Sequence, residues 1–83
     1  MSKEHITNNI RTLRFFKDEM TQQELAEAVG VTRQTIVAIE KGKYSPTLEI
    51  AFRMATVFDV PLEKVFTYDA EKDQFKKRKK KNC

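Results

Sequence analysis

With 83 residues, 40% of them hydrophobic, the chain has the size and composition of one small globular domain with a thin core. The single cysteine, Cys83, excludes a disulfide within the chain and fits a reducing cytoplasm. No apolar run approaches the ~18 residues of a membrane span, and no signal peptide is recognisable at the start. We therefore expect a cytoplasmic protein without a membrane partner.

The net charge of +4 is distributed unevenly along the chain. Residues 76–81 are all lysine or arginine and contribute +6, which leaves residues 1–75 with 10 of the 16 basic side chains and all 12 acidic ones. The body of the protein is thus slightly acidic. Its capacity to bind nucleic acid must depend on where its basic residues lie, not on its overall charge.

The first predicted helix covers about residues 9–17. Thr7 or Asn8 can cap its start by accepting a backbone N–H. Asp18, which tolerates a left-handed backbone, follows its end. The apolar residues that recur at helical spacing are expected to face the core: Ile10, Leu13 and Phe16.

A capping box opens the second predicted helix, because Thr21 and Glu24 are spaced so that each side chain can accept a backbone N–H of the other residue. Gly30 ends this helix in the left-handed conformation. Ala26 is small enough for another helix to approach closely. Three residues form the face that we expect to be buried: Leu25, Ala28 and Val29.

A third helix, at about residues 33–41, follows after a very short turn. Thr32 caps it, and Gly42 ends it. Its inward residues are Ile36, Ile39 and, in part, Val37. Two helices joined by about three residues, with a glycine at the start of the turn, form the helix-turn-helix pattern. The start of the second helix then protrudes, and a helix about 10–12 Å across fits the ~12 Å major groove of B-DNA.

A fourth helix is predicted at residues 48–58, capped by Thr47. Its polar residues form one narrow stripe, so we expect most of its surface to be covered: Glu49, Arg53 and Thr56. Pro61 suits the first turn of a short fifth helix. Residues 67–69 are compatible with a strand that pairs with residues around Ile6. We assign residues 1–69 to one domain and residues 70–83 to a basic tail.

The stretch MTQQELAEAVGVTRQTIVAIEKGKYSPTLEIAFRMA closely resembles the Cro/C1-type helix-turn-helix regulators, also called the Xre family. The resemblance covers about residues 8–66 and includes the segments TQ.ELA, GV..QTI, IE.G, SP.L and VPLE.VF. It implies an all-α, compact five-helix, lambda-repressor-like domain, to which we add a short two-stranded β element from the termini. It also implies a homodimer that binds double-stranded operator DNA, usually to repress transcription.

The resemblance implies roles for individual residues. Those that match base-reading positions are Arg33, Gln34, Thr35, Val37 and Ala38. Those assigned to the DNA backbone are Thr21, Gln22, Thr32, Lys41, Lys43 and Tyr44. Arginine can donate two hydrogen bonds to guanine, and glutamine can pair in the same two-pronged way with adenine. Arg14 and Glu40 match a structural ion pair between the first and third helices.

Apolar residues crowd the C-terminal part of the domain, and so small a body cannot bury them all. We therefore predict a dimer interface near the fifth helix, formed by Phe58, Leu62, Val65, Phe66 and Tyr68. A twofold dimer would place two recognition helices one DNA turn apart, ~34 Å, and would require a near-palindromic operator.

Two other functional hypotheses stay open. One is an antitoxin-like DNA-binding protein that also binds a protein partner, although no toxin-wrapping segment is evident apart from the tail. The other is a non-specific nucleic-acid binder led by residues 76–81, which are otherwise a solvated end that aids solubility. No nucleophile–base pair, phosphate loop or metal-ligand spacing is present, so we expect no enzyme activity, cofactor or metal site. No small-molecule effector is evident either.

Overall fold

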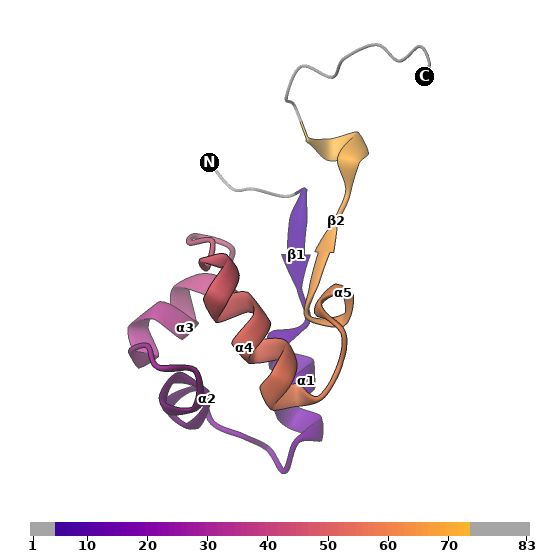
Figure 1. Cartoon of the computed structure of the whole chain (residues 1–83). Coiled ribbons are helices and arrows are strands. Elements are labelled where there is room, and N and C mark those ends of the chain that lie inside the picture. The colour runs from indigo at the N-terminus through magenta and orange to yellow at the C-terminus, as the bar shows by residue number, and fades with distance from the viewer. Residues whose placement is uncertain (1–4, 74–83) are drawn as a thin grey trace.

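The computed structural model describes residues 5–73, which form five α-helices, a two-stranded antiparallel sheet and a final 3-10 turn (Figure 1). The helices are α1 (Ile10–Phe16), α2 (Gln22–Val29), α3 (Arg33–Glu40), α4 (Leu48–Phe58) and α5 (Leu62–Val65). The strands are β1 (Ile6–Asn8) and β2 (Phe66–Tyr68). The predicted five-helix fold with a small terminal sheet is confirmed.

Threonine side chains define the starts of three helices. Thr21 accepts the backbone N–H of Glu24 at 3.0 Å, and the Glu24 carboxylate accepts the Thr21 N–H at 2.9 Å, so the predicted capping box of α2 is formed. Thr32 and Thr47 cap α3 and α4, each by accepting a backbone N–H three residues further on. These caps begin the helices where the sequence predicted them.

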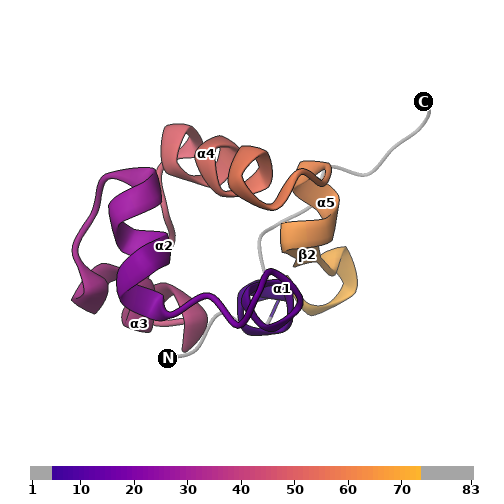
Figure 2. The same ribbon diagram turned by 90° about the horizontal axis from the view of Figure 1, so that it is seen from below.

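The core is formed by side chains from all five helices. Figure 2 shows these helices arranged around a common centre. The largest fully buried side chains of the core are Ile10, Leu25, Val29, Ile36, Met54 and Val65. Every helix supplies at least one of them. Burial of apolar surface stabilises the fold by about 25 cal/mol per Å², so no helix can move away without losing part of this contribution.

The end of α1 departs from the prediction. Phe16, expected in the core, is 77% exposed, and its ring packs edge-to-face on the ring of Phe15, which is also exposed. The physical reason is helix geometry: Phe16 follows Ile10 by six residues in α1, and at ~100° per residue it is turned ~120° around the helix from that buried residue, so it leaves the core face. Asp18 has a positive φ, as predicted, and Glu19 has one as well.

Two further expectations about helix faces are wrong. Ala28 of α2 is exposed, whereas Ala26 is fully buried. The buried face of α2 is therefore turned toward Ala26, the small residue that allows another helix to approach closely. On α4, the large side chains Leu48 and Phe52 are exposed beside the predicted polar stripe. The outward face of α4 is therefore broader than the sequence suggested.

The small sheet joins a segment before α1 to the segment after α5. β1 and β2 pair in antiparallel register, with Ile6 opposite Tyr68 and Asn8 opposite Phe66, so the predicted pairing near Ile6 is confirmed. Figures 1 and 2 place this sheet and α5 on the opposite side of the molecule from α2 and α3. None of the helices in the described part of the chain is both long and apolar enough to cross a membrane.

The described chain continues beyond residue 69, where the sequence placed the end of the domain. Residues 70–72 form the 3-10 turn, which the Asp69 side chain caps. The Tyr68 hydroxyl donates a 2.7 Å hydrogen bond to Asp73, and this bond raises the pKa of Tyr68 above its ordinary value. The predicted basic run of the tail, residues 76–81, lies outside the described residues.

Candidate nucleic-acid interface

The turn between α2 and α3 sets the angle of the two helices. Gly30 has φ of 83°, and its N–H and that of Val31 both donate to the Ala26 carbonyl, at 2.8 and 3.0 Å. A Cβ at Gly30 would be strained by this φ and would lie 3.1 Å from Nη1 of Arg53. Because Ala26 is fully buried beneath the turn, the helices approach closely, as the sequence predicted.

Arg53 of α4 holds this turn from outside the motif. Its Nη1 donates to the Val29 carbonyl at 3.0 Å, and its Nη2 contacts the Glu49 carboxylate at 2.7 Å. The Val29 carbonyl is among the last of α2, which have no partner within the helix. The sequence indicated only that Arg53 is polar and outward, so this contact was missed.

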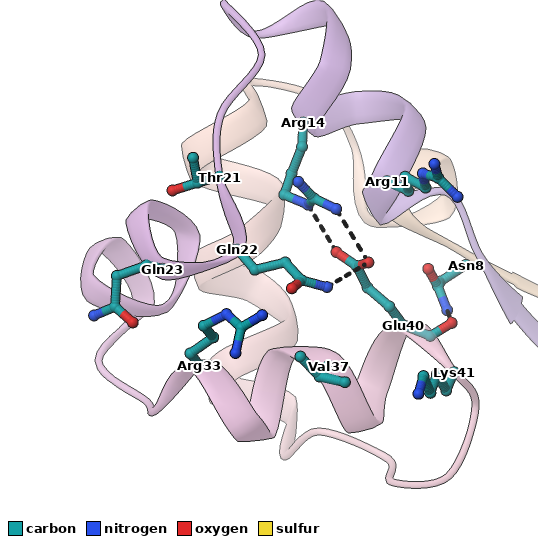
Figure 3. Close-up of a pocket in the computed structure, with 10 residues that line it drawn as sticks. All are labelled: Asn8, Arg11, Arg14, Thr21, Gln22, Gln23, Arg33, Val37, Glu40 and Lys41. Atoms are coloured by element: carbon teal, nitrogen blue, oxygen red, sulfur yellow. Dashed lines mark hydrogen bonds and ion pairs between the residues drawn. The ribbon is translucent and has the colours of Figure 1, made fainter.

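An ion pair joins α1 to the end of α3, as predicted. Arg14 donates from Nε and Nη2 to the two carboxylate oxygens of Glu40, at 2.8 and 3.2 Å, while Nη1 donates to the Met20 carbonyl at 2.8 Å. The two paired side chains are only 15% and 11% exposed. Gln22 at the start of α2 donates to the same carboxylate at 3.2 Å (Figure 3). Three helices are therefore tied together at Glu40.

Asn8 ties the start of α1 to the end of α3. Its Nδ2 donates to the carbonyls of Ile39 and Glu40, at 3.2 and 3.4 Å, and its Oδ1 accepts the Ile10 N–H at 3.1 Å. One side-chain amide thus satisfies groups that both helix ends leave without an internal partner. The sequence suggested a capping role for Asn8 but not its contact with α3.

A hollow of about 720 Å³ opens between α1, the start of α2 and α3 (Figure 3). Four cationic side chains line it: Arg11, Arg14, Arg33 and Lys41. The carboxylate of Glu40, the acidic group in this lining, is neutralised by Arg14. The hollow is therefore positively charged, although the rest of the body is acidic, and such a concave surface attracts anions.

The structure exposes the predicted base-reading residues unequally. Arg33 and Gln34 are exposed in the first turn of α3, and Arg33 borders the hollow. Thr35 is half-buried, and its hydroxyl shares a 3.0 Å hydrogen bond with that of Thr32. The two apolar candidates are also half-buried: Val37 and Ala38. Arg33 and Gln34 are thus the residues of α3 whose side chains are most accessible to a ligand.

The predicted backbone-contacting residues fall into two groups. Thr21, Gln22 and Lys41 line the hollow, whereas Lys43 and Tyr44 are exposed in the loop after α3 and do not line it. Thr32, exposed at the start of α3, caps that helix. The amide of Gln22 is already engaged with a carboxylate in this structure.

The hollow also contains residues that the sequence did not single out as site residues. Arg11 and Gln23 line it, as does Asn8. The sequence could have indicated Arg11 through its spacing from Arg14, because residues three apart in a helix share one face. No group of three potential metal ligands converges within residues 5–73.

The predicted dimer residues differ in how much surface they offer. Phe58 and Val65 are buried in the core of the single chain, so they cannot serve as interface residues in this arrangement. The physical reason is that α4 and α5 pack against each other through these side chains. Leu62 and Phe66 are half-buried, and Tyr68 is 53% exposed.

The fold and this hollow define a helix-turn-helix protein, and comparisons with known proteins agree. The sequence model of a family described as helix-turn-helix matches residues 10–65. The chain belongs to the Cro/C1-type, or Xre, family of helix-turn-helix transcriptional regulators. It is a DNA-binding regulator and not an enzyme, as the sequence predicted.

Individual relatives support this assignment. A protein of Archaeoglobus fulgidus, described as an uncharacterized HTH-type transcriptional regulator, is 53% identical over 55 residues, or 66% of this chain and 78% of that protein. The cryptic phage CTXphi transcriptional repressor RstR of Vibrio cholerae is 36% identical over 75 residues, or 90% of this chain and 66% of its own. The crystal structure of a Bacteroides fragilis protein is similar in fold, with a TM-score of 0.64 at 22% identity, covering 75% of this chain and 98% of that one.

Proposed function

We propose that the protein is a dimeric transcriptional repressor that recognises a near-palindromic operator by inserting the start of α3 into the major groove. The observation that carries this proposal is the exposed pair Arg33 and Gln34 in the first turn of α3, beside a positively charged hollow. Their side chains offer the donors and acceptors that distinguish guanine and adenine edges in the major groove.

The distribution of charge supports DNA as the ligand. Within residues 5–73, Arg11, Arg33 and Lys41 have no ion-pair partner, and all three line the hollow. Three unpaired cations that converge on one hollow, in a body that is acidic overall, favour contact with phosphates there and orient the protein on the duplex. The non-specific contacts would then hold α3 in register while its first turn reads bases.

The apolar side chains at α5 and β2 support a twofold dimer. Leu62, Phe66 and Tyr68 lie at α5 and β2, on the opposite side of the molecule from α2 and α3 (Figures 1 and 2). A contact between two copies through this surface would leave both α3 helices at the outer ends. That is the arrangement needed to reach two half-sites one DNA turn, ~34 Å, apart. Repression is proposed by analogy with RstR, which is named a repressor.

The experiment that tests the proposal is selection of bound sequences from a library of random DNA duplexes. We expect an enriched sequence with twofold symmetry and two half-sites with centres 10–10.5 base pairs apart. A reporter gene with that sequence across its promoter should be expressed less when the protein is present. Enrichment of no sequence, or of an asymmetric one bound by a single chain, would contradict the proposal.

A further inference from the structure

We infer that Arg11 of α1 contacts a DNA backbone phosphate, so that α1 adds an anchor outside the helix-turn-helix motif. This inference rests on the proposed function, because it assigns a further contact on the same DNA-binding face. Arg11 lines the hollow, has no side-chain partner within residues 5–73, and lies near the end of α3 that is opposite the base-reading turn.

The placement of Arg11 is fixed by the contacts around it. It lies three residues before Arg14, which is held by Glu40, and two contacts of Asn8 fasten the start of α1 to the last carbonyls of α3. The exposed Arg11 side chain and Lys41, which follows α3, both line the hollow at this junction (Figure 3). The two positive charges are thus presented on a rigid part of the fold.

The charge of Arg11 is not used within the described domain. Arg14 is paired with Glu40, and Arg53 is paired with Glu49. Arg11, by contrast, makes no side-chain hydrogen bond or ion pair within residues 5–73. A guanidinium group presents parallel N–H donors that match two oxygens of a phosphate, so an anionic oxygen pair is the ligand it fits best.

The length of α3 indicates which part of the DNA is within reach. The helix has 8 residues and is therefore ~12 Å long, about the width of the major groove. When the turn that carries Arg33 is in the groove, the other end of α3, where Arg11 and Lys41 lie, is near the groove's edge. The groove edge is formed by the sugar-phosphate backbone, so we assign Arg11 to a phosphate and not to a base.

The test compares Arg11→Gln with Lys17→Gln, which removes the same charge from an exposed residue at the end of α1 that does not line the hollow. Each full-length variant is titrated against the selected operator and a scrambled duplex at several salt concentrations. For Arg11→Gln, we expect the slope of log affinity against log salt to fall in magnitude by ~0.9 on both duplexes, and Lys17→Gln should leave it unchanged. If the variant and the parent bind equally at 1 M salt, this change in slope corresponds to about eightfold weaker binding by the variant at 0.1 M salt.

The outcomes separate the inference from the proposed function. Equal slopes for the two variants would overturn the phosphate contact, and so would a loss confined to the operator, because that would make Arg11 a base reader. Arg11→Lys, which keeps the charge, should retain the parental slope, and circular-dichroism melting should show all three variants folded. A parent protein that binds both duplexes equally would contradict the proposed sequence-specific function, while the comparison of slopes would still test Arg11.

Discussion

Arg33 combines exposure, a free guanidinium and a position in the first turn of α3. We expect Arg33→Ala to relax the preference for one base pair in each half-site and to cost ~1–3 kcal/mol of binding there. Competition binding with operators changed at each position measures this effect. Lys17→Ala removes a cation from an exposed site at the end of α1 that does not line the hollow, and should leave the preference intact. Identical preferences for the Arg33→Ala variant and the parent protein would refute the base-reading role.

Glu40 is the residue that joins three helices, so its charge matters to stability. Glu40→Gln leaves the half-buried Arg14 without a carboxylate, and we expect a loss of about 2–3 kcal/mol in the free energy of unfolding, because the pair is not fully buried. The control is Glu49→Gln, which breaks the exposed ion pair with Arg53, whose Nη2 lies 2.7 Å from the Glu49 carboxylate. This change should lower the free energy of unfolding by less than about 1 kcal/mol. Urea unfolding compares them, and equal losses would show that burial of the Glu40 pair is unimportant.

At the scale of elements, the glycine in the turn controls how α3 is presented. Gly30 and Gly42 both have positive φ, of 83° and 75°, but only the Gly30 site crowds an added Cβ, against Arg53 at 3.1 Å. Gly30→Ala and Gly42→Ala should each cost about 1–2 kcal/mol for the left-handed backbone. Gly30→Ala should cost more, because Arg53 must also move from the Val29 carbonyl. Thermal unfolding gives the comparison, and a smaller cost at Gly30 would contradict this account.

At the scale of the whole molecule, two aromatic residues of matched exposure distinguish possible dimer surfaces. Tyr68 on β2 is 53% exposed and Phe52 on α4 is 52% exposed. We expect Tyr68→Lys to shift the protein toward monomer and to weaken binding to a two-half-site operator, whereas Phe52→Lys should do neither. Sedimentation velocity and operator binding across protein concentrations measure the two effects. Dissociation by Phe52→Lys alone would place the interface on α4 instead.

The sequence by itself determined the features that depend on neighbours a few residues apart. The threonine caps, the left-handed Gly30 and, to within about one residue, the helix boundaries follow from local spacing, because capping bonds and helix faces repeat within one turn. The choice of Arg33 and Gln34 as base-reading candidates came from the resemblance to a family. The resemblance to a family supplied the Arg14–Glu40 pair, which local spacing does not reveal.

Only the tertiary structure decided which distant residues share a surface. Asn8 reaches carbonyls 31 and 32 residues away, and Arg53 reaches one 24 residues away. The burial of Phe58 and the exposure of Phe16 likewise depend on where neighbouring helices end. Periodicity defines the apolar face of a helix, but whether that face is covered depends on the packing of other elements. The same packing brings Arg11 of α1 beside the end of α3, and so sets the extent of the positively charged hollow.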